Sequence, residues 1–136
     1  MTSQQQELLE QARQAAFRAY APYSRFRVGA AVLAQGQIFP GANIENASSG
    51  LALCAERAAL AHARMHEAAE IEGLAVYCLD AAPDAAGTIP EDAALPCGAC
   101  RQWLAELAPD AWIVTNASPK AYRLSDLLPR PFRLPA

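Results

Sequence analysis

The alternation of helical segments with short apolar runs is the feature that most restricts the fold of this chain. Residues 51–69 form an alanine-rich segment with helical spacing, and an apolar run follows at 71–80. The same succession recurs with a helical segment at 97–108 and an apolar run at 111–116. Repeated helix–strand units favour helices that cover a mixed sheet. The sequence therefore predicts an α/β sandwich.

The N-terminal third adds one more helix and a hairpin. Apolar positions at helical spacing predict a helix from Gln4 to about Tyr20. Pro22 ends it, because the residue before a proline is pushed away from the helical region. Residues 25–44 are typical of two strands joined at Gln35 and its following glycine.

Two stretches carry little periodic signal. Residues 81–95 are rich in alanine, proline and aspartate without a period, which predicts a loop. The tail from residue 118 onward is expected to hold a short helical turn near Ser125–Leu128 and then prolines. We find no internal repeat and expect one domain over residues 1–136.

Composition narrows the class of partner. The chain is 53% hydrophobic and 18% charged, with a formal net charge of −3. Nucleic acids and anionic membrane surfaces both favour basic patches, and this balance provides none. We therefore expect a small neutral or weakly polar partner, with no nucleic acid and no membrane.

The N-terminus lacks the basic start and apolar run of an export signal. No apolar stretch approaches the roughly 20 residues that a membrane helix needs. The sequence thus favours a cytoplasmic protein. In that compartment disulfides are rare, and clustered cysteines more often bind metal or perform chemistry.

Cys97 and Cys100 are spaced as in a redox dithiol and equally as in half of a metal site. Pro96 and Gly98 place them where a loop becomes a helix. Unpaired backbone N–H groups and the helix dipole favour thiolates there. Taken alone, the pair leaves both roles open.

A zinc ion needs three or four ligands, and Cys54 is the candidate for the third. His62 is eight residues farther along the predicted helix, about 12 Å at roughly 1.5 Å per residue, and is too far to share an ion with Cys54. His62 and His66 lack the intervening glutamate of a metalloprotease helix, so we interpret them as surface residues. Cys78 lies in an apolar run and is expected to be a buried thiol.

Three ligands, rather than four, are typical of catalytic zinc sites, which keep one position for water. Glu56 follows Cys54 at the distance of two residues and is a candidate proton shuttle beside that position. Three thiolates leave the site with a net negative charge. Helix N-termini and the cation of Arg57 are expected to offset it.

The stretches CAER (54–57) and PCGACRQ (96–102) resemble the signature of zinc-dependent cytidine deaminases, in the small homotetrameric form with three cysteine ligands. The resemblance implies a three-layer α/β/α sandwich with a mixed sheet of about five strands. It implies one Zn²⁺ per chain on the three cysteines, with Glu56 as acid and base. The implied reaction converts cytidine and 2′-deoxycytidine to uridine, 2′-deoxyuridine and ammonia, in pyrimidine salvage.

Other stretches resemble the family's substrate-binding segments. The segment AYAPYSRFRVGAAVL (19–33) places Phe26 against the substrate, and NIENAS (43–48) assigns Asn43 and Glu45 to the ribose hydroxyls. The resemblance also implies a substrate contact at Ala55. LLPRPF (127–132) supplies Phe132, which in the family stacks on the base from a neighbouring subunit of a homotetramer.

The chain departs from the family at Ser49, where a tyrosine is common, and at Leu95, where a serine is common. Alternatives also remain. They are a deaminase with the same zinc core acting on blasticidin S, a deaminase of bases within polynucleotides, a thiol-disulfide oxidoreductase using Cys97 and Cys100, and a noncatalytic zinc-stabilised interaction module.

Overall fold

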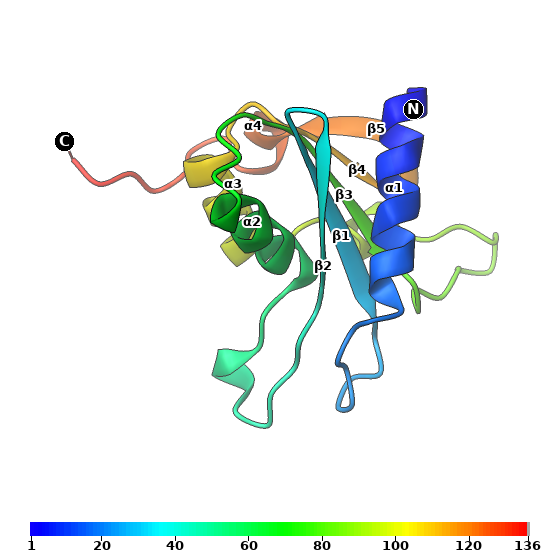
Figure 1. The fold of residues 1–136 in the computed structure, drawn as a ribbon. Coiled ribbons are helices and arrows are strands. Elements are labelled where there is room, and N and C mark those ends of the chain that lie inside the picture. The colour runs from blue at the N-terminus through cyan, green and yellow to red at the C-terminus, as the bar shows by residue number, and fades with distance from the viewer. Residues whose placement is uncertain (136) are drawn as a thin grey trace.

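The computed structural model describes residues 1–135, and this part of the chain forms one sheet between two layers of helices (Figure 1). The strands are β1 (Val28–Ala34), β2 (Gln37–Ala42), β3 (Ile71–Cys78), β4 (Trp112–Thr115) and β5 (Ser118–Arg123). The helices are α1 (Ser3–Ala16), α2 (Ala55–Met65), α3 (Gly98–Leu107) and α4 (Leu124–Leu127), with single 3₁₀ turns η1 (Ser49–Leu51) and η2 (Glu91–Ala93).

The sheet is mixed, with the strand order β2-β1-β3-β4-β5. Strands β3 and β4 are parallel, and the other neighbouring pairs are antiparallel. Figure 1 shows α1 on one face of the sheet and α2 and α3 on the opposite face. The prediction of a three-layer α/β/α sandwich with about five strands is confirmed.

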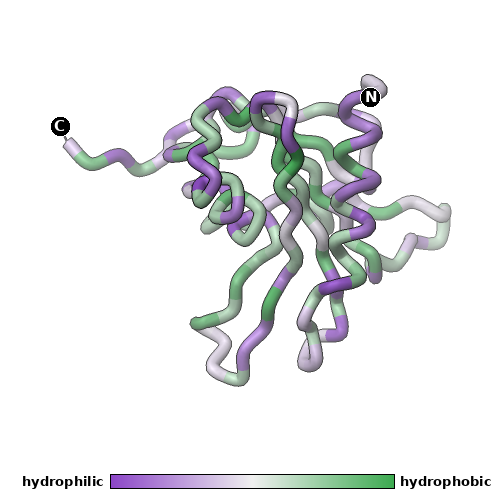
Figure 2. The backbone as a smooth tube through the Cα atoms, viewed as in Figure 1, coloured by the Kyte–Doolittle hydropathy of each residue, from purple (hydrophilic) through white to green (hydrophobic). Residues whose placement is uncertain are grey.

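Each face of the sheet has its own apolar core. On the α1 side, Leu8 and Ala12 pack against Leu33 and Val114. On the other side, alanines and leucines of α2 and α3 cover β1 and β3. Figure 2 shows the same division, with apolar central strands and polar positions along the outer side of α1. The small alanine side chains let the helices lie close to the sheet.

The predicted hairpin is confirmed, and its turn explains the sequence there. Gln35 and Gly36 have φ angles of 52° and 77°, both in the left-handed region. Two left-handed residues in succession are what a tight two-residue hairpin turn requires. Gly36 adopts that conformation without steric cost.

Helix α1 ends at Ala16, earlier than the predicted boundary near Tyr20. The Tyr20 N–H donates to the Asn43 carbonyl at 2.9 Å, and the Tyr20 carbonyl accepts from the Glu45 N–H at 2.8 Å. Residue 20 is therefore extended and pairs with the segment after β2. This long-range pairing outweighs the local helical pattern.

The predicted tail contains strand β5, which the sequence pattern did not indicate. Ser118–Arg123 pairs with β4 in antiparallel register and forms one edge of the sheet. Pro119 is compatible with a strand only because an edge strand can leave an N–H position unpaired. The helical turn predicted after it is confirmed as α4. No helix in the described part of the chain has the length and apolarity needed to cross a bilayer.

Candidate functional site

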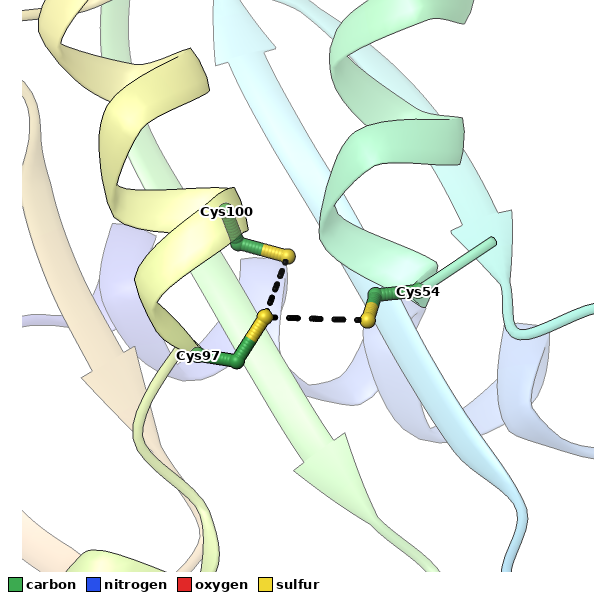
Figure 3. A group of neighbouring side chains, drawn as sticks. All are labelled: Cys54, Cys97 and Cys100. Atoms are coloured by element: carbon green, nitrogen blue, oxygen red, sulfur yellow. Dashed lines mark hydrogen bonds between the residues drawn. The ribbon is translucent and has the colours of Figure 1, made fainter. Parts of the chain in front are cut away.

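Three cysteine side chains meet where helices α2 and α3 begin (Figure 3). Cys54 is the N-cap residue of α2, and Cys97 is the N-cap residue of α3. Cys100 lies in the first turn of α3 and is buried, whereas Cys97 is exposed. The two helix N-termini thus point their free N–H groups toward one group of thiols.

A glycine in β2 fixes the position of α2. A Cβ atom added at Gly41 would collide with the backbone of Ala55 and Ala59, in the first turns of α2. The helix that carries Cys54 therefore lies in direct backbone contact with the sheet. Glycine is required here for close approach rather than for its conformational freedom.

The spacing of the thiols fits a zinc ion. The Sγ atoms of Cys54 and Cys97 are 3.8 Å apart, and those of Cys97 and Cys100 are 3.5 Å apart. Tetrahedral zinc with Zn–S bonds of about 2.3 Å holds its sulfurs about 3.8 Å apart. Within residues 1–135, no fourth histidine, cysteine or carboxylate joins this group. The cluster can therefore hold one zinc ion and leave a coordination position free of protein.

Charge around the thiols favours the thiolate of Cys54. Its pKa is lowered to about 5, because it accepts hydrogen bonds from Cys100 and from Arg57. The Arg57 Nη2 atom lies 3.3 Å from the Cys54 Sγ atom. The pKa of Cys100 is raised, because this thiol donates to Cys54 and is buried. Cys54 is thus the first of the two to lose its proton.

Glu56 lies beside the cluster and is only 5% exposed. Burial raises the pKa of this carboxyl to about 7, and the negative charge on Cys54 adds to the effect. Such a carboxyl can take up and release a proton near neutral pH.

The cluster opens into a cavity of about 190 Å³. The cavity is bounded by the start of β1, the end of β3, the first turn of α2 and the loop before α3. Its lining residues are Phe26, Val28, Asn43, Cys54, Ala55, Glu56, Val76, Cys78, Ala93, Ala94, Leu95 and Cys97. Six of the residues predicted from the sequence as ligands, proton shuttle or substrate contacts are therefore brought together around one space.

A larger cavity, of about 320 Å³, lies between α1 and β2, with Arg18 and His62 in its wall. The His62 Nδ1 atom lies 3.0 Å from the Pro40 carbonyl oxygen. Neither His62 nor His66 belongs to the thiol group. We place the chemistry in the smaller cavity, because it alone contains the thiols and the buried carboxyl.

Asn43 holds one wall of the site cavity in place. Its Oδ1 atom accepts from the Val28 N–H at 2.9 Å, and its Nδ2 atom donates to the Phe26 carbonyl at 2.9 Å. The amide therefore fixes the backbone on either side of Arg27. This keeps the half-buried Phe26 at the cavity.

Two predicted substrate contacts do not line the cavity. Glu45 accepts hydrogen bonds from the backbone N–H groups of Tyr23 and Ser24 and from the Ser24 hydroxyl, which lower its pKa. Phe132 is 69% exposed on the tail beyond α4. Ser49, the departure in η1, is exposed and also lies outside the lining residues.

Sequence reasoning missed Cys78 as a member of the site. The residue is buried as predicted, but it also forms part of the cavity wall. Burial raises the pKa of its thiol to about 12, and Glu56 contributes. Cys78 lies at the end of β3, which is paired in parallel with β4. Ligand sites form at the carboxyl ends of such strands, and this position could have indicated that Cys78 belongs to the site.

Residues 2–116 match the family model described as the cytidine and deoxycytidylate deaminase zinc-binding region. The chain belongs to this family. The spacing of Cys97 and Cys100 left a redox role and a metal-binding role open. Membership of this family and the presence of a third thiol favour metal binding.

Among deaminases, the cytidine deaminase of Halalkalibacterium halodurans is 48% identical over 105 residues, covering 76% of this chain and 72% of the relative. The crystal structure of cytidine deaminase from Mycobacterium tuberculosis matches with a TM-score of 0.79 and 37% identity, over 98% of this chain and all of that one. That of Burkholderia pseudomallei matches equally well, with a TM-score of 0.79 and 37% identity over 97% of this chain and 100% of that one.

Proposed function

We propose that this protein, acting as a single domain over residues 1–136, hydrolyses cytidine and 2′-deoxycytidine to uridine, 2′-deoxyuridine and ammonia. One observation carries the proposal: three thiols at zinc spacing lie beside the buried carboxyl of Glu56 in a single cavity. Relatives at 41–48% identity bear the name cytidine deaminase, which supports the same substrate class. The activity belongs to pyrimidine salvage.

Cys54, Cys97 and Cys100 hold the zinc ion in this proposal. When bound, zinc lowers the pKa of a coordinated water to near neutrality and so supplies a nucleophile at neutral pH. Arg57 offsets the negative charge of the thiolates through its contact with the Cys54 sulfur. The helix N-termini act in the same direction.

Glu56 carries the protons of the reaction. Its carboxylate takes one proton from the water that attacks C4 of the base, and delivers it to N3. Glu56 then moves the second proton, from the hydroxyl now on C4, to the exocyclic nitrogen. The C4–N4 bond breaks, ammonia leaves, and the C4–O bond becomes the carbonyl of uridine. A pKa of about 7 suits both uptake and release.

Phe26 and Ala55 contact the substrate in this proposal, and Asn43 and Glu45 bind the ribose hydroxyls. Asn43 keeps a second Nδ2 hydrogen beyond its bond to Phe26, and the Glu45 carboxylate keeps free lone pairs. Phe132 stacks on the base of a neighbouring chain in a homotetramer. The free thiols suit a reducing compartment, and we therefore propose a cytoplasmic enzyme.

The test is cytidine turnover by the purified protein, followed through the fall in ultraviolet absorbance, with zinc content measured on the same sample. We expect rapid conversion to uridine with one zinc per chain. Turnover of blasticidin S, but not of cytidine, by the zinc-loaded protein would overturn the proposed substrate. Insulin reduction by metal-free protein would return Cys97 and Cys100 to a redox role.

A further inference from the structure

The tail beyond α4 is held by one side chain. The Gln102 Nε2 atom donates to the Phe132 carbonyl at 2.8 Å, and the Phe132 N–H donates to the Gln102 Oε1 atom at 3.2 Å. Within residues 129–135 of the described chain, these are the only hydrogen bonds. Figure 1 shows this segment leaving the body of the molecule beside α3.

The tail is stiff enough for a single anchor to set its direction. Pro129 and Pro131 lock their own φ angles. Each also restricts the residue before it to extended conformations, so Leu128 and Arg130 are constrained as well. Few rotatable bonds remain between the end of α4 and Phe132. Anchoring the backbone of Phe132 therefore fixes the direction of its Cα–Cβ bond.

The anchor belongs to the helix that carries two of the cysteine ligands. Gln102 follows Cys100 by two residues on α3. The neighbouring Arg101 donates through Nη1 to the Leu127 carbonyl and through Nε to the Pro96 carbonyl, both at 2.7 Å. These contacts tie the end of α4 to the residue before Cys97. The tail and the cysteine cluster therefore share one rigid support.

The anchor uses only the backbone of Phe132 and leaves its ring free. The residue is 69% exposed and does not line the cavity of its own chain. An exposed aromatic ring on a braced segment is suited to insertion into a second molecule.

We propose that Gln102 is a positioning residue, which presents the Phe132 ring to the substrate base in the active site of a second copy of this chain. The inference rests on the proposed function. Gln102 itself touches no substrate. It acts by preserving the direction of the tail, so that the backbone of the tail does not have to be ordered when the substrate binds.

A double-mutant cycle tests the proposal. Gln102→Met keeps the length of the side chain and removes both hydrogen bonds. We expect it to raise KM for cytidine at least about fivefold, within the range that loss of base–aromatic stacking produces, while kcat changes much less. In a Phe132→Ala background the same substitution should change KM less than about twofold, since the ring that it positions is gone. Gln102→Glu keeps the acceptor and loses the donor, and should fall between wild type and Gln102→Met.

Zinc content and melting temperature are measured for every variant, and Glu106→Ala, at an exposed position on the same helix, is the matched control. An equal effect of Gln102→Met with and without Phe132 would overturn the proposal, as would an unchanged KM or a loss confined to zinc content. If Gln102→Met does not fold, Gln102→Glu takes its place in the cycle. Its effect on KM is then compared with and without Phe132→Ala, and the same outcomes support or overturn the proposal. Turnover of cytidine by the wild-type protein in this assay tests the proposed function by itself. That activity can be present even if the effects of Gln102→Met and Phe132→Ala on KM are independent.

Discussion

The cysteine cluster and the substrate-contacting segments of this molecule are held in place by different means. Cys54, Cys97 and Cys100 lie at the starts of helices that pack along the sheet through alanines and leucines. Phe26 and Phe132 lie on irregular backbone. The Asn43 amide and the Ser24 hydroxyl hold the backbone around Phe26, and the Gln102 amide holds that of Phe132.

The two kinds of support should respond differently to single substitutions. Helix packing is spread over many apolar contacts, so no single packing contact alone determines the position of the cluster. We use the name polar clamp for a side chain, such as Asn43 or Gln102, whose hydrogen bonds hold a segment of backbone. The segment depends on those few bonds, so one substitution can release it. We expect changes at the cluster to decide whether catalysis occurs, and changes at the clamps to decide how well substrate binds.

The largest effect is expected at the cluster itself. Cys100→Ala removes a buried ligand and leaves two thiols, too few for a stable zinc site. We expect zinc content to fall close to zero and cytidine turnover to fall to background. Cys78→Ala is the matched control for metal content, since Cys78 is a buried cysteine outside the cluster. Equal zinc loss in both variants would mean that the metal is not held as proposed.

Removing the proton shuttle should uncouple metal binding from chemistry. Glu56→Gln keeps the shape of the buried side chain but cannot carry a proton. We expect kcat to fall about 10²–10⁴-fold, the usual contribution of general acid–base catalysis. Zinc content should stay unchanged. Turnover within tenfold of wild type would remove Glu56 from the mechanism.

A smaller effect should follow from shifting α2 as a whole. Gly41→Ala forces a Cβ atom into the backbone of the first turns of α2. We expect it to destabilise the fold by about 1–3 kcal/mol, as overpacking does, and to lower zinc affinity. Gly50→Ala is the control, because an added Cβ there meets nothing within 4 Å. A matching loss of melting temperature in both variants would contradict the role given to the close contact at Gly41.

The smallest effect is expected at another polar clamp. Asp80 accepts three hydrogen bonds from Arg27, which lower the pKa of its carboxyl from 3.8 to about 2. Because the unfolded chain binds the proton more readily, the stabilisation is complete above about pH 4 and is lost as pH falls toward 2. Asp80→Asn should therefore lower the melting temperature slightly at neutral pH and raise KM modestly.

The difference in melting temperature between wild type and Asp80→Asn should narrow as the pH is lowered. Zinc content should not change. A difference that stays constant down to acidic pH would show that the charge of Asp80 is not what holds Arg27.

The place of each cysteine was predictable from the sequence, because the start of a helix follows from local rules. Cysteines at the starts of predicted helices carry their own positional signal, and a third thiol was needed to complete a zinc site. The hairpin was predictable for the same reason, since its turn residues are local. What the helix starts and the hairpin turn share is that neighbours in the sequence determine them. The meeting of Cys54 with Cys97, 43 positions away, was instead inferred from the number of ligands that zinc needs.

The remaining features depend on contacts between distant residues. Strand β5 exists because β4 offers it a partner, although Pro119 weakens its local pattern. Cys78 enters the cavity only because β3 ends there, and Gln102 reaches a backbone 30 positions away. The predicted roles of Glu45 and Phe132 come from resemblance, and they stay predictions until substrate binding is measured.

The distance along the chain between the cysteines has a consequence for the lifetime of the protein. Cys54 and Cys97 are 43 positions apart, and the segment between them contains the central strand β3. An ion bound to both acts as a cross-link that restricts the unfolded chain, worth about 4 kcal/mol on the scale used for disulfides. Survival of the protein against heat and proteases is therefore tied to the supply of free zinc. A shortage of the metal would deplete the protein itself as well as its activity.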